Sequence, residues 1–242
     1  MMRAKVIGAS IVPFAVEPMF GHHYFLLGKE RGIRGWHDSG KWSDFGGGFM
    51  KADVDAEGCA AREFHEETLG VVACDDAPEV HSISALARRL RNKEYAFRLD
   101  VWIRPGVVYV TFVIEIPFQP ESRDSFRQRR HQYNIMRTTK DCYLEKTQIQ
   151  WWSRPQLIQG MRTYSGVIAR GVHGRTEKLQ GLFKCRGRHI LHQFPLQATL
   201  LTNAPRHSRV DAGRPPSRFV TGTDGLQAAL SRPIARPPRR PS

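Results

Sequence analysis

The chain has 242 residues and a formal net charge of +14, from 37 Lys and Arg against 23 Asp and Glu. Its 40% hydrophobic content can supply a buried core, and its length allows one large domain or two small ones. No apolar run reaches the ~18 residues that a spanning helix needs, so a transmembrane segment is excluded. The charge favours polyanionic partners: nucleic acid, polyphosphates or acidic membranes.

The cysteines are scattered along the chain without CxxC spacing, which argues against a zinc site. They are Cys59, Cys74, Cys142 and Cys185. This pattern fits free thiols in a reducing compartment, so we expect a cytoplasmic protein. The basic start weakly resembles a signal peptide, but its many β-branched residues favour a first strand.

The N-terminal part predicts strands. The first is expected over 5–17, and Pro13 within it predicts an edge position or a bulge. A second strand is expected over 23–29, so that the two form a hairpin. Residues 30–40 carry three glycines and mixed charge, which indicates a surface loop. A short strand over 41–45 should follow.

The stretch that organises the chain is residues 46–71, GGGFMKADVDAEGCAAREFHEETLGV. Its glycines permit positive φ and a close approach of the backbone to a ligand. Asp53 or Asp55 can cap a helix predicted over 56–69. Gly70 suits the position just after the end of that helix.

Three carboxylates lie on one face of this predicted helix. Glu63, Glu66 and Glu67 are related by i, i+3 and i+4, and like charges so close repel. Something cationic is therefore expected opposite them. A hard divalent ion such as Mg²⁺ takes oxygen ligands and usually keeps waters and substrate phosphates in its shell.

The stretch resembles the Nudix box, written G-x5-E-x7-R-E-U-x-E-E-x-G-U with U a bulky apolar residue. Gly48 falls on the first glycine, and the run from Arg62 to Glu67 falls on R-E-U-x-E-E. Two positions depart from the box: Val54 stands where the first Glu is usual, and Leu69 is an extra residue. The resemblance implies an α/β fold, a Nudix-like α/β/α sandwich with a mixed β-sheet.

The resemblance also implies roles for particular residues. Glu63, Glu66 and Glu67, with the carbonyl of Gly47, would hold Mg²⁺ or Mn²⁺. Arg62 would orient a catalytic carboxylate through a charge-assisted hydrogen bond, and Glu67 is one candidate for the base that positions water. The aspartates on either side of Val54, 53 and 55, could substitute for the missing Glu, although neither stands at the family position.

The segment after the box predicts a short helix over 84–92 and two strands. The strands are expected over 95–103 and 107–118, and the second is nearly all apolar, as for a central strand covered on both faces. Residues 119–140 then become rich in arginine and aromatic residues.

Arg127, Arg129 and Arg130 are the candidates for substrate binding in this basic insert, since arginine binds phosphate bidentately. Its aromatic residues could stack on bases. An exposed basic loop without a ligand is the alternative.

Residues 144–157, LEKTQIQWWSRPQL, are similar to a late segment of several Nudix enzymes, including mRNA-decapping ones. There a Glu precedes a strand that ends in Trp, and a short helix follows. Glu145 matches, with Trp151 six residues on. The resemblance implies that Glu145 is a general base or a further metal ligand, and a salt bridge to Arg62 or a lysine is the alternative.

The C-terminal part predicts a loop over 161–176 and a helix over 177–194, in one or two pieces. From 203 onward Pro and Arg dominate, so a disordered basic tail is expected. The expected domains are a Nudix hydrolase domain over 1–202 and this tail over 203–242.

These features predict a metal-dependent hydrolase of the diphosphate linkage in a nucleoside diphosphate joined to another group. The substrate would be a nucleotide, a dinucleoside polyphosphate or capped RNA. Partners would be a phosphorylated small molecule or RNA, with nucleic acid contacted through the basic insert and tail, and no membrane. The alternative, motivated by Val54, is a catalytically weak Nudix-like module that binds nucleotide or RNA.

Overall fold

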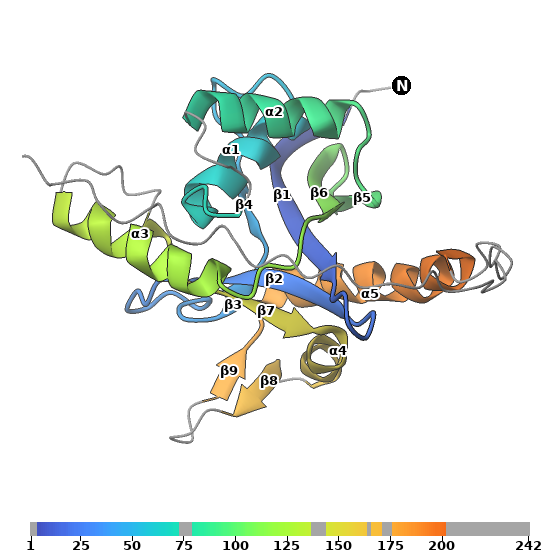
Figure 1. Cartoon of the computed structure of the whole chain (residues 1–242). Helices are drawn as coiled ribbons and strands as arrows, with labels where there is room; N and C mark the ends of the chain where they lie inside the picture. The colour runs from blue at the N-terminus through green and yellow to red at the C-terminus, as the bar shows by residue number, and fades with distance from the viewer. Residues whose placement is uncertain (1–3, 73–78, 137–143, 164–165, 171–175, 202–242) are drawn as a thin grey trace, which may run out of the picture. The chain divides into compact units, whose positions relative to one another are not determined.

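A computed structural model describes residues 4–72, 79–136, 144–163, 166–170 and 176–201 (Figure 1). The tail expected over 203–242 lies outside these residues. The strands are β1 (Lys5–Val16), β2 (His23–Glu30), β3 (Trp42–Ser43), β4 (Phe45–Gly48), β5 (Phe97–Arg104), β6 (Val107–Glu115), β7 (Lys146–Ser153), β8 (Val167–Arg170) and β9 (Thr176–Lys178). The helices are α1 (Ala56–Thr68), α2 (Glu79–Arg91), α3 (Ser122–Met136), α4 (Arg154–Arg162) and α5 (Gly181–Leu201).

A mixed sheet of seven strands forms the centre of the fold. Its order is β3-β2-β1-β6-β5, with β4 also paired to β1 and β7 to β2. β1 runs parallel to β6 and antiparallel to β2 and β4. The predicted hairpin of the first two strands is confirmed. The apolar β6 lies between β1 and β5, as expected for a strand covered on both faces.

Pro13 does not mark a sheet edge. On one side of β1, the pairing with β6 runs from Lys5 to Phe14 and includes Pro13. On the other side β4 pairs with Gly8 to Ile11, and β2 pairs with Phe14 to Val16. Pro13 falls between these two partners, where its missing N–H costs no ladder bond. The predicted edge position is wrong because the strand changes partner at the proline.

Helices cover both faces of the sheet. One buried core contains Ile11 and Phe112 with Phe64 of α1, and α2 joins it. The other contains Val12 with Phe183 of α5, and α4 joins it. Neighbouring strand residues such as Ile11 and Val12 enter opposite cores because successive side chains of a strand point to opposite faces. The expected α/β/α sandwich with a mixed sheet is confirmed.

Two segments predicted or allowed as loops contain regular structure. The basic insert forms α3, with Phe126 buried, rather than an exposed loop. Its few apolar residues give only a weak helical period, which explains the miss. Residues 161–176 contain β8, which pairs with β9. The C-terminal helix, α5, begins at Gly181 and is continuous to Leu201.

Cys59 on α1 is a free, fully buried thiol. Burial raises its pKa to about 12, with the Asp53 carboxylate adding to the effect. It therefore serves packing beneath the glycine strand, as a small apolar residue would. No helix in the described ranges is long and apolar enough to cross a membrane.

Candidate functional site

The helix α1 carries the box carboxylates and is fixed at both ends. Asp55 is its N-cap and accepts a hydrogen bond of 2.8 Å from the Gly58 N–H. The helix ends at Thr68, and the extra Leu69 adopts a left-handed φ of 57° with its side chain buried. Gly70 follows at φ 66°. The extra residue Leu69 therefore lies beyond the helix and does not change the spacing of the carboxylates up to Glu67.

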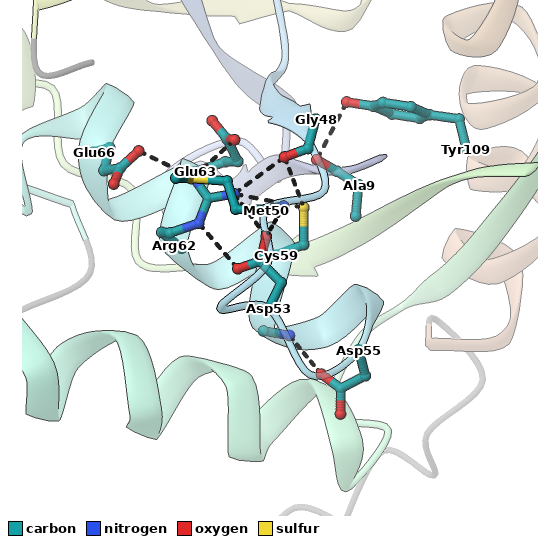
Figure 2. A network of polar contacts seen from close by, with 11 residues as sticks. Ala9, Gly48, Met50, Asp53, Asp55, Cys59, Arg62, Glu63, Glu66 and Tyr109 are labelled. Atoms are coloured by element: carbon teal, nitrogen blue, oxygen red, sulfur yellow. Dashed lines mark hydrogen bonds and ion pairs between the residues drawn. The ribbon is translucent and has the colours of Figure 1, made fainter. Parts of the chain in front are cut away.

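Arg62 joins the box carboxylates to the loop before the helix (Figure 2). Its Nε and Nη2 donate to the two oxygens of Asp53 at 3.0 and 2.8 Å. Its Nη1 donates to Glu63 at 2.9 Å and to Glu66 at 3.2 Å. Val54, at the family position of the first Glu, is 87% exposed. The preceding residue, Asp53, supplies the carboxylate that anchors Arg62.

Burial and neighbouring charges act in opposite directions on these carboxyls. At Asp53 burial alone would raise the pKa, but hydrogen bonds from Arg62 and the Met50 N–H lower it overall. At Glu63 burial raises the pKa more than Arg62 lowers it, and the charge of Glu66 contributes. Asp53 is therefore held ionised, whereas the ionised form of Glu63 would be stabilised by a nearby cation.

Glu145, in the segment just before β7, lies within electrostatic reach of the helix. Burial raises its pKa, with Lys146 opposing and the carboxylates of Glu30 and Glu66 adding. The charge of Glu145 in turn helps to raise the pKa of Glu63. The charge of Glu145 is thus felt by Glu63, and that of Glu66 by Glu145, although the segments are about 80 residues apart in sequence.

Glu67 lies in a different environment, behind the other carboxylates. Its side chain is 3% exposed, and it accepts a hydrogen bond of 2.7 Å from the Gly46 N–H. The Lys146 ammonium lies 3.1 Å from it and also contacts Glu30 and the Ser43 hydroxyl. Burial alone would lower the pKa of Lys146, but Glu67 and Glu30 raise it overall, so this lysine is held charged.

Sequence reasoning missed the pairing of Lys146 with Glu30. The two residues are directly opposite in the antiparallel pairing of β7 with β2. Opposite charges at such positions stabilise a sheet. Only the register of these strands brings the residues together, so no local pattern signals the pair.

The glycines of β4 leave room for the carboxylates. A Cβ on Gly47 would lie 2.6 Å from the carboxylate of Glu63, and one on Gly46 would lie 2.2 Å from Cβ of Ser10. The Gly47 carbonyl faces Gly8 across the pairing of β1 with β4. Both positions therefore require glycine for steric reasons.

The donor set fits a hard divalent ion in its chemistry. Carboxylates and a backbone carbonyl are the oxygen ligands that such ions prefer, and bare Gly47 leaves space beside Glu63. Within the part of the chain that the structure describes, no three such side chains are already arranged around a metal position. Arg62 and Lys146 hold these carboxylates instead, so a bound ion would have to compete with both.

The three arginines predicted to bind substrate lie in different places on α3. Arg130 donates from Nε to the Lys146 carbonyl at 2.9 Å, which places it beside the site. Arg129 donates to the Leu69 carbonyl at 3.2 Å, at the end of α1. Arg127 is 82% exposed, and its ion pair is with Asp124, one turn back on the same helix.

Two cavities border Glu30, beside the carboxylates. One, of about 250 Å³, extends from Gly46 and Gly47 to Tyr109 and Arg186. The other, of about 460 Å³, is lined by Glu30, Arg31, Ile33, Trp36 and Glu145. The volume of the second cavity falls within the usual range of small-ligand pockets.

The first cavity is lined in part by Arg186, a residue that sequence reasoning also missed. It reaches from α5 and donates to Asp44 at 2.9 Å and to the hydroxyls of Ser10 and Thr111 at 3.1 Å. Its guanidinium lies 4.8 Å from the ring centre of Tyr109. These partners are far apart in the sequence, so only the folded chain reveals them.

The family model for the NUDIX domain matches residues 8–133, just over half of the chain. No functionally curated protein matches the sequence.

Solved structures with a similar fold include three Nudix proteins. A Nudix hydrolase from M. Smegmatis, RenU, has 13% identity and a TM-score of 0.39, covering 78% of this chain and 88% of its own. A mutT/nudix family protein from Listeria innocua has 14% identity and a TM-score of 0.41, covering 84% and 100%. The NUDIX domain of Shewanella oneidensis NrtR, complexed with ADP ribose, has 12% identity and a TM-score of 0.40, covering 80% and 90%. These low identities and TM-scores carry no information on the substrate. The match of the family model shows that the chain belongs to the Nudix hydrolase family.

Proposed function

We propose that this chain is a Mg²⁺- or Mn²⁺-dependent hydrolase that cleaves the diphosphate linkage of a nucleoside diphosphate joined to another group. The main observation that supports it is the gathering of Glu63 and Glu66 around Arg62, with the charge of Glu145 within electrostatic reach. A binding module without turnover has no need to gather carboxylates at this energetic cost.

Glu63 and Glu66, with the Gly47 carbonyl, are the proposed metal ligands, and Glu67 is proposed as a further one. A divalent ion there would supply charge neutralisation on the diphosphate oxygens and a bound water of lowered pKa. Glu67 can contribute only if its contact with the Lys146 ammonium is released. Arg62 contacts carboxylates, so its proposed role is to position Glu63 and Glu66.

Glu145 is the stronger of the two candidates for the general base. Its side chain is exposed to the cavity, whereas Glu67 is buried behind the glycine strand. Burial raises the pKa of Glu145, which makes its carboxylate a better proton acceptor from water. Glu67 remains proposed as the alternative base.

Arg130 is the arginine best placed to bind substrate phosphate. It lies beside Lys146 at the site, and both burial and the charge of nearby Arg31 lower its pKa. The positive charges of Arg31 and Arg130 together favour a nearby anion, and arginine binds phosphate bidentately. Arg129 and Arg127 are proposed as outer contacts for a longer polyanion such as RNA.

An assay on a panel of nucleotides, dinucleoside polyphosphates and capped RNA, with Mg²⁺, tests the proposal. We expect Glu63→Gln, Glu66→Gln and Glu67→Gln each to lose most metal-dependent hydrolysis while the fold survives. Glu94→Gln is the matched control, since Glu94 pairs on the surface with Arg89.

Full activity of both Glu66→Gln and Glu67→Gln would refute the proposed site. Nucleotide or RNA binding without turnover on the whole panel would instead favour the catalytically weak binding module.

A further inference from the structure

We propose that Trp36 and Arg31 form a base-binding arm of the site, which stacks the base of a nucleoside polyphosphate substrate and contacts its phosphates. The inference rests on the proposed function and names the class of substrate. Trp36 and Arg31 line the cavity of about 460 Å³ whose remaining walls are Glu30, Ile33 and Glu145. The aromatic ring and the proposed base catalyst therefore share one cavity.

The loop that carries Trp36 is a closed, hydrogen-bonded turn. The Trp36 N–H donates to the Ile33 carbonyl at 3.2 Å, and the Ser39 N–H donates to the Trp36 carbonyl at 3.1 Å. The Ser39 hydroxyl accepts from the Ile33 N–H at 2.8 Å. A ring presented on such a turn loses little further conformational entropy when a ligand binds.

The same loop is tied to the catalytic side of the site. The Arg31 N–H donates to the Glu145 carbonyl at 2.8 Å. The charge of Arg31 reaches the carboxyl of Glu145 and the guanidinium of Arg130. A phosphate chain that runs from the ring toward Glu145 therefore passes two arginines before it meets the carboxylates.

The exposure of the ring supports a role in binding. Trp36 is 41% exposed and Ile33 43%, whereas Trp42 and Trp152 are almost fully buried in the core. An exposed indole beside an arginine suits a ligand with a flat aromatic face and negative charge. Glu30 and Glu145 in the same cavity disfavour phosphate unless a cation accompanies it. A nucleoside polyphosphate with its bound divalent ion supplies the aromatic face, the negative charge and the accompanying cation. Inorganic polyphosphate has no aromatic face to stack on the indole.

The chain offers a matched control for Trp36. Trp102 on β5 is 62% exposed and lines neither of the two cavities beside Glu30. A loss of binding in Trp36→Ala but not in Trp102→Ala separates stacking in the cavity from a general effect of removing an exposed indole.

The test is a binding titration with Mg²⁺ and a methylene-bridged, non-hydrolysable analogue of diadenosine tetraphosphate, followed by tryptophan fluorescence and calorimetry. Quenching is expected in the wild type and in Trp102→Ala. Trp36→Ala should weaken the affinity about five- to a hundredfold, the usual range for removal of one base–aromatic stack. Trp36→Phe should retain most of it, and Arg31→Met should weaken the binding of both the analogue and tripolyphosphate.

The stacking assignment would be overturned if Trp36→Ala bound the analogue as tightly as the wild type. It would also be overturned if Trp36→Ala lost as much affinity for tripolyphosphate as for the analogue. The absence of any quenching in the wild type would have the same consequence. Because the analogue is not hydrolysed, these outcomes do not depend on turnover. A Trp36-dependent affinity without Mg²⁺-dependent hydrolysis on the substrate panel would refute the proposed function and leave the base-binding arm in place.

Discussion

The buried ammonium of Lys146 lies 3.1 Å from the carboxylate of Glu67, a residue whose motif position implies metal binding. The same ammonium contacts Glu30, so two carboxylates share one positive charge. With all three groups ionised, this cluster has an excess negative charge in a region of low dielectric. Lys146 thus supplies part of the cationic partner that the spacing of the box carboxylates requires, and the remaining negative charge attracts a proton or a further cation.

Removal of the Lys146 charge should strongly destabilise the metal-free chain. Lys146→Met leaves the carboxylates of Glu30 and Glu67 buried without their partner, and breaking a buried ion pair from one side costs roughly 3–5 kcal/mol. Urea unfolding in EDTA measures the change. A divalent ion should stabilise this variant more than the wild type, because the vacated position offers it two carboxylates.

Arg89→Met is the control for this substitution. Arg89 pairs with Glu94, and both side chains are 49% exposed. An exposed pair contributes at most about 1 kcal/mol, so this variant should unfold nearly as the wild type does. Equal effects of the two substitutions would show that the Lys146 cluster is not an electrostatic centre.

Asp53 should be required to hold Arg62. The two side chains are paired through two hydrogen bonds and are largely buried. Asp53→Asn removes one charged acceptor, and hydrogen bonds to charged groups contribute about 1.5–3 kcal/mol each. We expect a loss of that order in the free energy of unfolding, together with a lower kcat, since Arg62 would no longer be fixed against Glu63 and Glu66.

Val54 provides the internal comparison. Its side chain is 87% exposed, so Val54→Ala should change the stability by no more than about 0.5 kcal/mol. Val54→Glu, which restores the usual box residue, should not raise activity, because Asp53 already occupies the guanidinium edge. A gain of activity in Val54→Glu would contradict this reading of Asp53.

The sequence was most informative where the geometry is local. The spacing of Glu63 and Glu66 fixes their common helix face whatever the rest of the chain does. Of the two predicted cap candidates, Asp55 is the N-cap, and the helix ends one residue before its predicted end, with Leu69 rather than Gly70 as the first left-handed residue. The resemblance to the Nudix box then implied the sandwich, which the structure confirms.

Features that depend on strand register could not be predicted in this way. The pairing of Lys146 with Glu30 joins residues 116 positions apart, and that of Arg186 with Asp44 joins residues 142 apart. A shift of one residue between β2 and β7 would turn each side chain to the other face of the sheet. Pro13 was misread for a related reason, since its tolerance depends on where β1 changes partner.

Arg130 and Arg127 should differ in their effect on a polyanionic substrate. Arg130 lies at the site, whereas Arg127 is 82% exposed on the outer face of α3. For capped RNA we expect affinity to fall steeply with salt, because each phosphate contact on a single strand adds about 0.7 to the slope of log K against log salt. Arg130→Met should reduce this slope by about one contact, and Arg127→Met should leave it nearly unchanged.

Unfolding curves accompany this titration, because the Nε of Arg130 also donates to the Lys146 carbonyl. If Arg130→Met binds RNA more weakly but unfolds as the wild type does, the lost affinity is due to a lost contact with RNA and not to a change in the fold. A flat salt response of the wild type would count against RNA as a substrate, and equal slopes of the two variants would remove Arg130 from the proposed phosphate contacts.

The stability of the metal-free chain should fall as pH rises above about 4.5, the usual pKa of a glutamate. Burial raises the pKa of Glu67 well above its usual value, with Glu30 and Glu63 adding and Lys146 opposing. The folded state therefore binds this proton more tightly than the unfolded state does, so the free energy of unfolding decreases between the unfolded and the folded pKa. We expect a higher value near pH 5 than near pH 7, with a slope of at most about 1.4 kcal/mol per pH unit for this one proton.

Glu67→Gln isolates this contribution, because it keeps the shape of the side chain and leaves Lys146 paired with Glu30. In urea titrations with EDTA the variant should lose most of the slope, whereas Glu94→Gln, on the exposed surface, should keep it. The lowered pKa values of Asp53 and Asp55 act in the opposite sense, since their stabilisation is lost as pH falls below about 4. A slope in Glu67→Gln equal to that of the wild type would mean that the excess charge of the Lys146 cluster is carried by another group.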